Sequence, residues 1–136
     1  MKYLVDANVL SEPTKPAPDV RVVKWLRENE SQLATSAIVL GEIEYGILLL
    51  PAGRRRTRLQ QWFAQGTQRI RALDFDADTA SAWAGLLARM KKKGLAMPIK
   101  DSLIAATAQV HGLTVATRNT ADYRNVGIPQ VNPFDE

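Results

Sequence analysis

The feature that most constrains the fold is an alternation of short β-branched runs with longer segments whose apolar residues recur at helical spacing. The strand-like runs cover residues 2–5, 32–35, 71–75 and 113–117, with a last apolar piece at 128–131. The helical segments cover residues 20–29, 36–50, 54–65, 76–93 and 100–110. Strands that alternate with helices favour parallel pairing, because each crossover returns the chain to the same edge. The sequence therefore predicts a three-layer α/β/α fold with a mainly parallel central sheet.

The chain has the size of one domain and no obvious linker. Its 136 residues contain no internal repeat, so we expect a single domain spanning residues 1–136. The opening MKYLVDANVL is too short in apolar residues for a signal peptide or a membrane span, which predicts a cytoplasmic protein with no membrane association. There is no cysteine, so a metal ion would have to bind through oxygen or through the lone His111.

Acidic residues recur where the predicted strands end or the predicted helices begin. Asp6 directly follows the first strand, and Asn119 and Asp122 follow the strand at 113–117. Asp101 falls in the first turn of its helix, and Glu42 in the early turns of another. The carboxyl ends of parallel strands meet at one edge of the sheet, where loops and helix N-termini converge. We therefore expect these side chains to gather at a single place.

Several carboxylates at one place repel one another unless a cation lies between them. Oxygen ligands select hard ions, and Mg²⁺ or Mn²⁺ uses few carboxylates while keeping water in its remaining positions. Such an ion acidifies a water molecule and neutralises phosphate oxygens. The acidic residues thus predict a metal-dependent hydrolase of phosphodiester bonds.

Five stretches of the chain together resemble the PIN-domain ribonucleases of the VapC type, the toxins of bacterial toxin–antitoxin pairs. They are LVDANVLSE at the start, SAIVLGEIEYG around Glu42, DSLIAATA from Asp101, LTVATRNTADY from Leu113, and the closing VNPF. The resemblance implies that Asp6 and Asp101 are the principal metal ligands and that Glu42 completes the cluster. It also implies an endoribonuclease that forms a homodimer and is inhibited by a cognate antitoxin.

One position departs from some members of that family. Asn119 stands directly after Thr117-Arg118, where some relatives have aspartate, and Asp122 follows three residues later. Either Asp122 takes the charged role with Asn119 holding water or a neighbouring ligand, or Asn119 itself completes the site. The choice between one and two metal ions depends on this position and stays open.

Other candidate residues have both a structural and a functional interpretation. Asn8 either closes an Asx-turn or orients Asp6, and Thr117 either fills the strand or donates a hydroxyl hydrogen bond to a ligand. Ser36 is more typical of a helix cap than of a catalytic group. The glycines on either side of Glu42, at positions 41 and 46, suggest a close approach there.

Basic residues dominate the rest of the molecule. The formal net charge is +4. Setting aside Asp6, Glu42, Asp101 and Asp122 leaves ten acidic residues against 18 basic ones, a net charge of +8. The densest basic run contains Arg54, Arg55, Arg56 and Arg58. It is either a solvated helix face or a contact with the RNA backbone.

Other functions fit these residues less well than a nuclease does. A phosphotransferase of the haloacid dehalogenase kind also places an aspartate after its first strand, but it wants a second acid two residues later, where this chain has Asn8. A non-catalytic RNA- or protein-binding module with a PIN-like fold would not need Asp6, Glu42 and Asp101 all present. We therefore predict an endoribonuclease and keep the binding module as the alternative.

Overall fold

Five parallel strands form the central sheet of the computed structural model, which describes residues 1–135. The strands are β1 (Tyr3–Val5), β2 (Leu33–Ser36), β3 (Arg71–Leu73), β4 (Thr114–Ala116) and β5 (Gln130–Val131). Their order in the sheet is β3-β2-β1-β4-β5, and every neighbouring pair is parallel. The predicted parallel α/β architecture is therefore confirmed.

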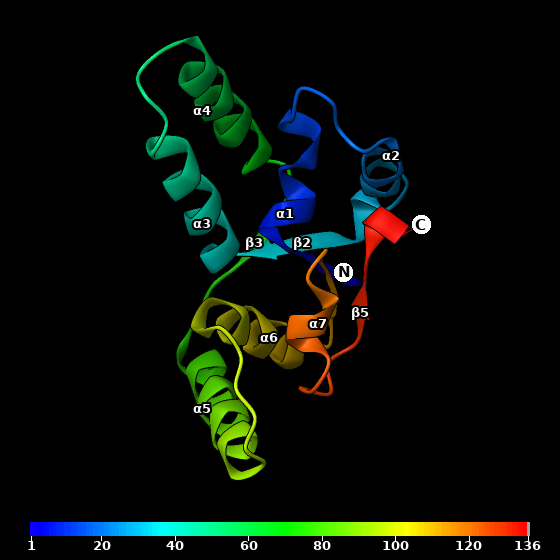
Figure 1. Cartoon of the computed structure of the whole chain (residues 1–136), viewed down its shortest axis with the longest axis vertical. Coiled ribbons are helices and arrows are strands. Elements are labelled where there is room, and N and C mark those ends of the chain that lie inside the picture. The colour runs from blue at the N-terminus through cyan, green and yellow to red at the C-terminus, as the bar shows by residue number, and fades with distance from the viewer. Residues whose placement is uncertain (136) are drawn as a thin grey trace.

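Helices cover both faces of this sheet. The longer ones are α2 (Val20–Glu28), α3 (Ala37–Leu48), α4 (Arg54–Gly66), α5 (Ala77–Lys92) and α6 (Ile99–His111). Figure 1 shows α3 and α4 on one side of the sheet and α5 and α6 on the other, which makes three layers. All five of these helices begin and end within about two residues of the sequence prediction.

Short helical turns are the elements that periodicity did not predict. They are the helices α1 (Ala7–Leu10) and α7 (Thr120–Tyr123) and the 3₁₀ turns η1 (Glu12–Thr14), η2 (Glu30–Gln32) and η3 (Pro133–Asp135). A segment of three or four residues makes about one turn, so it shows no recurrence of apolar positions. Within the described residues, no helix combines the length and apolar character needed to cross a membrane.

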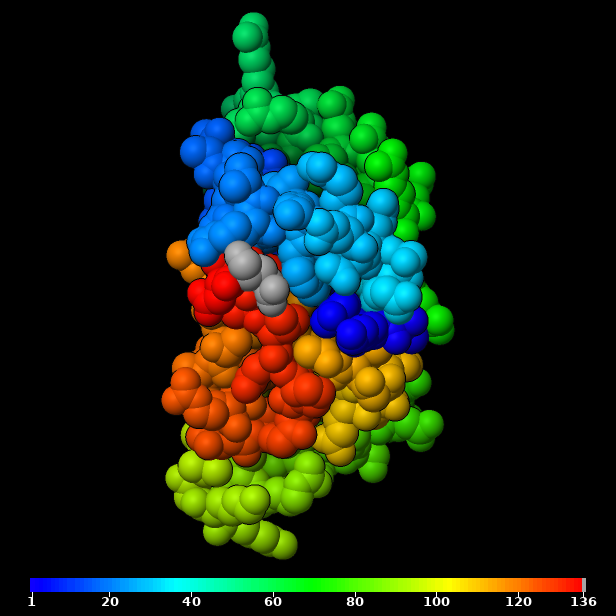
Figure 2. Space-filling view, turned by 90° about the vertical axis from the view of Figure 1, so that its right-hand side faces the viewer, coloured from blue at the N-terminus to red at the C-terminus, as the bar shows by residue number. Residues whose placement is uncertain are grey.

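The apolar residues form two buried clusters. The larger one contains Leu4 of β1, Ile104 of α6 and Tyr123 of α7. The smaller one joins Val22 and Trp25 of α2 to Phe134 of η3. Figure 2 shows the C-terminal segment, in red, lying against α2, in blue, so this segment packs on α2 at one side of the molecule.

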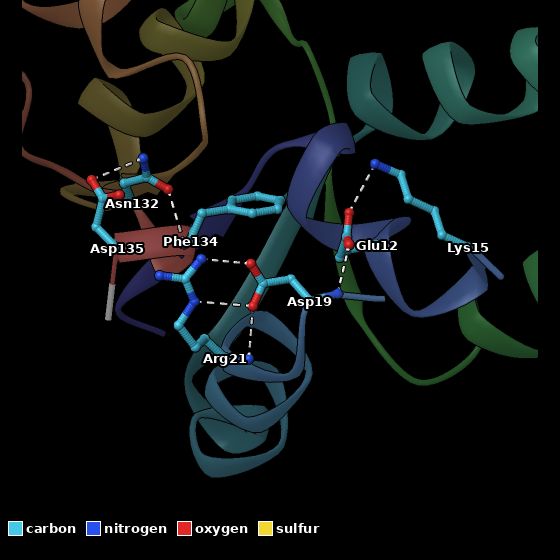
Figure 3. A network of polar contacts seen from close by, with 7 residues as sticks. All are labelled: Glu12, Lys15, Asp19, Arg21, Asn132, Phe134 and Asp135. Carbon is cyan, nitrogen blue, oxygen red and sulfur yellow. Dashed lines mark hydrogen bonds and ion pairs between the residues drawn. The ribbon is translucent and has the colours of Figure 1, made fainter. Parts of the chain in front are cut away.

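Buried Glu12 fixes the proline-containing segment between α1 and α2 (Figure 3). Its Oε2 accepts a hydrogen bond from the backbone N–H of Asp19 at 2.8 Å, and its Oε1 lies 2.9 Å from Lys15 Nζ. Asp19 in turn caps α2 and pairs with the Arg21 guanidinium at 2.8 Å. This network fixes the N-terminus of α2 against the segment that follows α1.

Candidate active site

The strand order creates a topological switch point between β1 and β4. The strands β2 and β3 lie on one side of β1, and the strands β4 and β5 lie on the other side. In open parallel sheets, ligands bind at the carboxyl ends of the strands flanking such a point. Val5 pairs with Ala116 in the register, so Asp6 and Thr117 are the first residues beyond the two strands. The sheet therefore delivers these two side chains to one place.

Asp6 is a buried carboxylate, with 4% of its surface exposed. Its Oδ1 accepts the backbone N–H of Ala7 at 2.8 Å, which caps α1. Its Oδ2 accepts the Thr117 hydroxyl at 2.8 Å. Burial raises the pKa of Asp6, while these two hydrogen bonds act in the opposite direction. The carboxylate is thus held in one orientation at the carboxyl end of β1.

The Thr117 hydroxyl has its direction fixed by its neighbours. It accepts hydrogen bonds from the backbone N–H of Asn119 at 3.0 Å and from Asn8 Nδ2 at 3.4 Å. Its own proton is therefore available for Asp6 Oδ2. Asn8 also accepts the backbone N–H of Arg118 through Oδ1 at 3.0 Å. Thr117 thus holds the Asp6 carboxylate in one orientation, and Asn8 supports Thr117.

Asp101 is a second buried acid, in the first turn of α6, with 6% of its surface exposed. Its pKa is raised to about 7, first by burial and then by a side-chain hydrogen bond with Asp122 and the negative charge of Asp6. Asp122 is half-buried in α7, whereas Asn119 is exposed and donates its backbone N–H to the Thr117 hydroxyl. Of the two candidates left open by the sequence, Asp122 is the one beside Asp101.

Glu42 completes the group from the second turn of α3. Its Oε1 lies 2.6 Å from Lys100 Nζ, while its Oε2 is buried and has no hydrogen-bond partner within residues 1–135. The ion pair with Glu42 raises the pKa of Lys100, and the charges of Asp101 and Asp6 add to that effect. The four acids Asp6, Glu42, Asp101 and Asp122 are called the acidic centre below.

The glycines beside Glu42 do not mark a close approach, so that part of the sequence argument is wrong. A Cβ added to Gly41 or Gly46 would meet no atom within 4 Å. Ser36 serves as the helix cap that was expected, because its Oγ accepts the backbone N–H of Val39 at 3.1 Å. It thereby fixes the start of the helix that carries Glu42.

The acidic centre is suited to a divalent cation that keeps several water ligands rather than to one coordinated by protein side chains alone. Over residues 1–135, no three histidine or acidic side chains are grouped tightly enough to enclose a metal ion directly. The acids nevertheless influence one another, since the charge of Glu42 raises the pKa of Asp6 and the charge of Asp6 raises the pKa of Asp101. Mg²⁺ needs only one or two direct carboxylates, and the unpartnered Oε2 of Glu42 offers one such ligand atom. The residues present therefore fit such an ion.

An open cavity of about 370 Å³ adjoins the acidic centre between α1, α3 and α4. Its lining includes Asn8, Glu42 and Arg55. Arg54, Arg55 and Arg58 are exposed on the first turns of α4, whereas Arg56 is half-buried and donates to the carbonyl of Leu50 at 3.5 Å. Arg55 is thus the member of the basic run that shares a cavity with an acid of the centre.

Two residues of this site were missed by the sequence analysis. Lys100 pairs with Glu42, and buried Tyr123 lies close enough to all four acids for their charges to affect it. Lys100 precedes Asp101 and Tyr123 follows Asp122 directly, so their adjacency to candidate acids was the available signal. Their side-chain directions depend on how α6 and α7 pack, which adjacency alone does not show.

The fold and its acids define an α/β domain with a carboxylate centre at the switch point of its sheet. The chain belongs to the PIN-domain family, whose model matches residues 3–128. Among curated proteins it is similar to the VapC ribonuclease Y4jK of Sinorhizobium fredii, with 36% identity over 136 residues and 97% of each chain covered. It is also 35% identical to Toxin FitB of Neisseria gonorrhoeae over 137 residues, covering 98% of this chain and 99% of that protein.

Solved structures agree with these relatives. FitAcB from Neisseria gonorrhoeae superposes with a TM-score of 0.89 at 35% identity, covering 98% of this chain and 99% of that one. VapBC-5 from Mycobacterium tuberculosis, a member of the VapBC family of toxin–antitoxin systems, gives a TM-score of 0.63 at 26% identity, covering 73% and 82% of the two chains. The resemblance seen in the sequence motifs is therefore confirmed.

Proposed function

We propose that this protein is a Mg²⁺- or Mn²⁺-dependent endoribonuclease and the toxin of a toxin–antitoxin pair. The observation that carries the proposal is the acidic centre at the switch point, with Asp6 and Asp101 buried and one Glu42 oxygen unpartnered. Two similar proteins, the VapC ribonuclease Y4jK and Toxin FitB, are named as a ribonuclease and as a toxin, which supports the proposal.

Each acid has a distinct part in this proposal. Asp6 and Asp101 would be the principal ligands of the cation, with Glu42 and Asp122 beside them. The cation, when bound, would acidify the attacking water and offset the charge of the phosphate. Thr117 and Asn8 keep the Asp6 carboxylate turned in one direction, which avoids reorganisation during the reaction. Lys100 supplies a positive charge next to Glu42 that is available to a phosphate.

A cleavage assay tests the proposal directly. End-labelled bulk RNA is incubated with purified protein in Mg²⁺, in Mn²⁺ and in EDTA, with Asp6→Asn from the same purification as the control for contaminating nucleases. Cleavage by the unsubstituted protein alone, and only with metal, is the expected result. If RNA stays intact in every condition and calorimetry detects no Mn²⁺ binding, the chain is instead a non-catalytic module of this fold.

Arg55→Gln is expected to weaken RNA binding about fivefold and to lower the salt dependence of binding by a slope of about 0.7, the value for one phosphate contact on a single strand. Arg58→Gln is the matched control, because Arg58 lies on the same helix, exposed, outside the cavity that Arg55 lines. Affinity is measured by filter binding over a range of salt concentrations in the Asp101→Asn background, so that no RNA is cut. Equal effects of both substitutions would mean that Arg55 has no specific role.

Two protein partners belong to the same proposal, a second copy of the chain and a cognate antitoxin. Apolar side chains stay exposed at the end of α3, where Tyr45, Leu48 and Leu49 each have half or more of their surface in contact with solvent. A separate, mainly apolar cavity of about 340 Å³ is lined by residues of α2, α3 and α4, including Leu26 and Trp62. Surfaces of this kind support association with other chains. Light scattering on the purified protein tests the homodimer.

A further inference from the structure

Arg118 is an exposed cation at the carboxyl edge of the sheet, two residues beyond the end of β4. Its backbone N–H donates to Asn8 Oδ1 at 3.0 Å, and Asn8 also contacts the Thr117 hydroxyl that holds Asp6. At the other end of the side chain, the guanidinium carbon lies 4.6 Å from the centre of the Phe134 ring. Arg118 is therefore fixed both at its backbone and at its charged group.

The Phe134 ring gives the guanidinium a rigid support next to the acidic centre. Phe134 is buried, in the apolar cluster that contains Val5 and Ala116, the last residues of β1 and β4. Its backbone N–H donates to Asn132 Oδ1 at 2.9 Å, a contact drawn in Figure 3. Asp6 directly follows Val5. The ring, and the cation over it, thus lie at the same edge of the sheet as the four acids.

No acid within residues 1–135 neutralises Arg118, because the ion pairs of this part of the chain involve other cations. Asp135, the next residue after Phe134, accepts a hydrogen bond from Asn132 Nδ2 at 3.2 Å instead. A guanidinium that covers an aromatic ring with one face keeps its N–H donors in its own plane, where a pair of them matches two oxygens of a phosphate. An arginine held in this way loses little rotational freedom when it binds an anion. These contacts favour a phosphate site over a solvated surface charge.

We propose that Arg118 binds the RNA strand through a phosphate that neighbours the one being cleaved. The inference rests on the proposed endoribonuclease function and names a contact with its substrate. The cation whose charge acts on both Asp6 and Asp101 is Lys100, which is therefore the one beside the scissile phosphate. Phe134 follows β5, which lies two strand spacings from β1, or about 10 Å. Arg118 is thus displaced along the edge toward β5, as a contact with a flanking phosphate requires.

Arg118→Gln is expected to weaken RNA binding about tenfold and to lower the salt dependence of binding by a slope of about 0.7, the value for one phosphate contact on a single strand. Arg118→Lys keeps the charge but has neither a planar face for the ring nor a pair of coplanar donors. Its affinity should therefore fall about threefold with the salt slope unchanged. The probe is an end-labelled single-stranded RNA of mixed sequence. Filter binding over a range of salt concentrations measures affinity in the Asp101→Asn background with Mg²⁺.

Arg71→Gln is the matched control, because Arg71 is an exposed arginine at the first residue of β3 and so lies at the opposite edge of the parallel sheet. It should leave RNA affinity and the salt slope at the parent values. If Arg118→Gln behaved like Arg71→Gln, the inference would be overturned. A lower unfolding temperature in EDTA together with unchanged RNA affinity would also overturn it, by assigning the contact with Phe134 to the fold alone.

The cleavage assay on the unsubstituted protein separates this inference from the proposed function. If that protein cuts no RNA with either metal, the proposed function fails and the inference fails with it. If it cuts RNA while Arg118→Gln binds the probe as tightly as the parent does, only the inference is lost.

Discussion

Asp101→Asn is expected to reduce RNA cleavage by at least about a thousandfold while leaving the fold intact. In the proposed function, the substitution would remove one negative charge and one ligand from the cation. Metal stabilisation of a transition state is worth several kcal/mol, and each 1.36 kcal/mol corresponds to tenfold in rate. Asparagine has the same shape as aspartate, so the buried position on α6 stays filled. Single-turnover cleavage of end-labelled RNA with saturating Mg²⁺ measures the loss.

Asp78→Asn is a suitable control for that experiment, because Asp78 is an exposed acid in the first turn of α5, on a different helix from Asp101. It should cleave RNA at the parent rate. Circular dichroism and thermal unfolding in EDTA verify that both variants are folded. Cleavage retained within tenfold in a folded Asp101→Asn protein would remove Asp101 from the proposed ligands.

The metal-free protein is expected to become less stable as the pH rises from about 4.5 to about 8. The folded chain raises the pKa of Asp101 from 3.8 to about 7, so between these values it binds more protons than the unfolded chain does. Stability falls with pH wherever the native state binds more protons. The shift of about three units corresponds to roughly 3 to 4 kcal/mol, an upper bound, since the titration is shared with Asp122. Burial of Asp6 acts in the same direction.

Other shifted acids do not obscure this window. The pKa values of Glu12 and Asp76 are lowered, so their contributions change below about pH 4.5 and have the opposite sign. Thermal unfolding in EDTA should show the melting temperature falling by about 5 to 10 °C between pH 4.5 and pH 8. Asp101→Asn should flatten that dependence, and Mn²⁺ at a hundred times its Kd should restore about 2.7 kcal/mol at pH 8. A metal-free protein that is equally stable at both pH values would contradict the raised pKa of Asp101.

Much of the fold follows from local pattern. The strands around Leu4 and Val115 are short apolar runs, and the long helices carry their stripe of apolar residues at regular spacing, so both kinds of element are visible in the sequence. The helices α1 and α7 were missed because one turn has no period. Asp6 caps the first of them, which explains why a position that looks like a turn is helical.

The acidic centre was predictable in part. Asp6, Glu42, Asp101 and Asp122 could be named because each lies at a strand end or in the early turns of a helix. Asp122 lies closer to Asp101 than Asn119 does because of the way α7 packs against α6. The spacing of three residues between Asn119 and Asp122 does not determine that packing. The burial of Tyr123 depends on the same packing, so neither feature follows from spacing alone.

The 2.6 Å pair between Lys100 and Glu42 gives the four acids a counter-ion that belongs to the chain itself. The ammonium offsets the charge of Glu42 at Oε1, and its charge also acts against the rise in the pKa of Asp6 and of Asp101. Lys100 thus reduces the repulsion that gathering these carboxylates costs the fold.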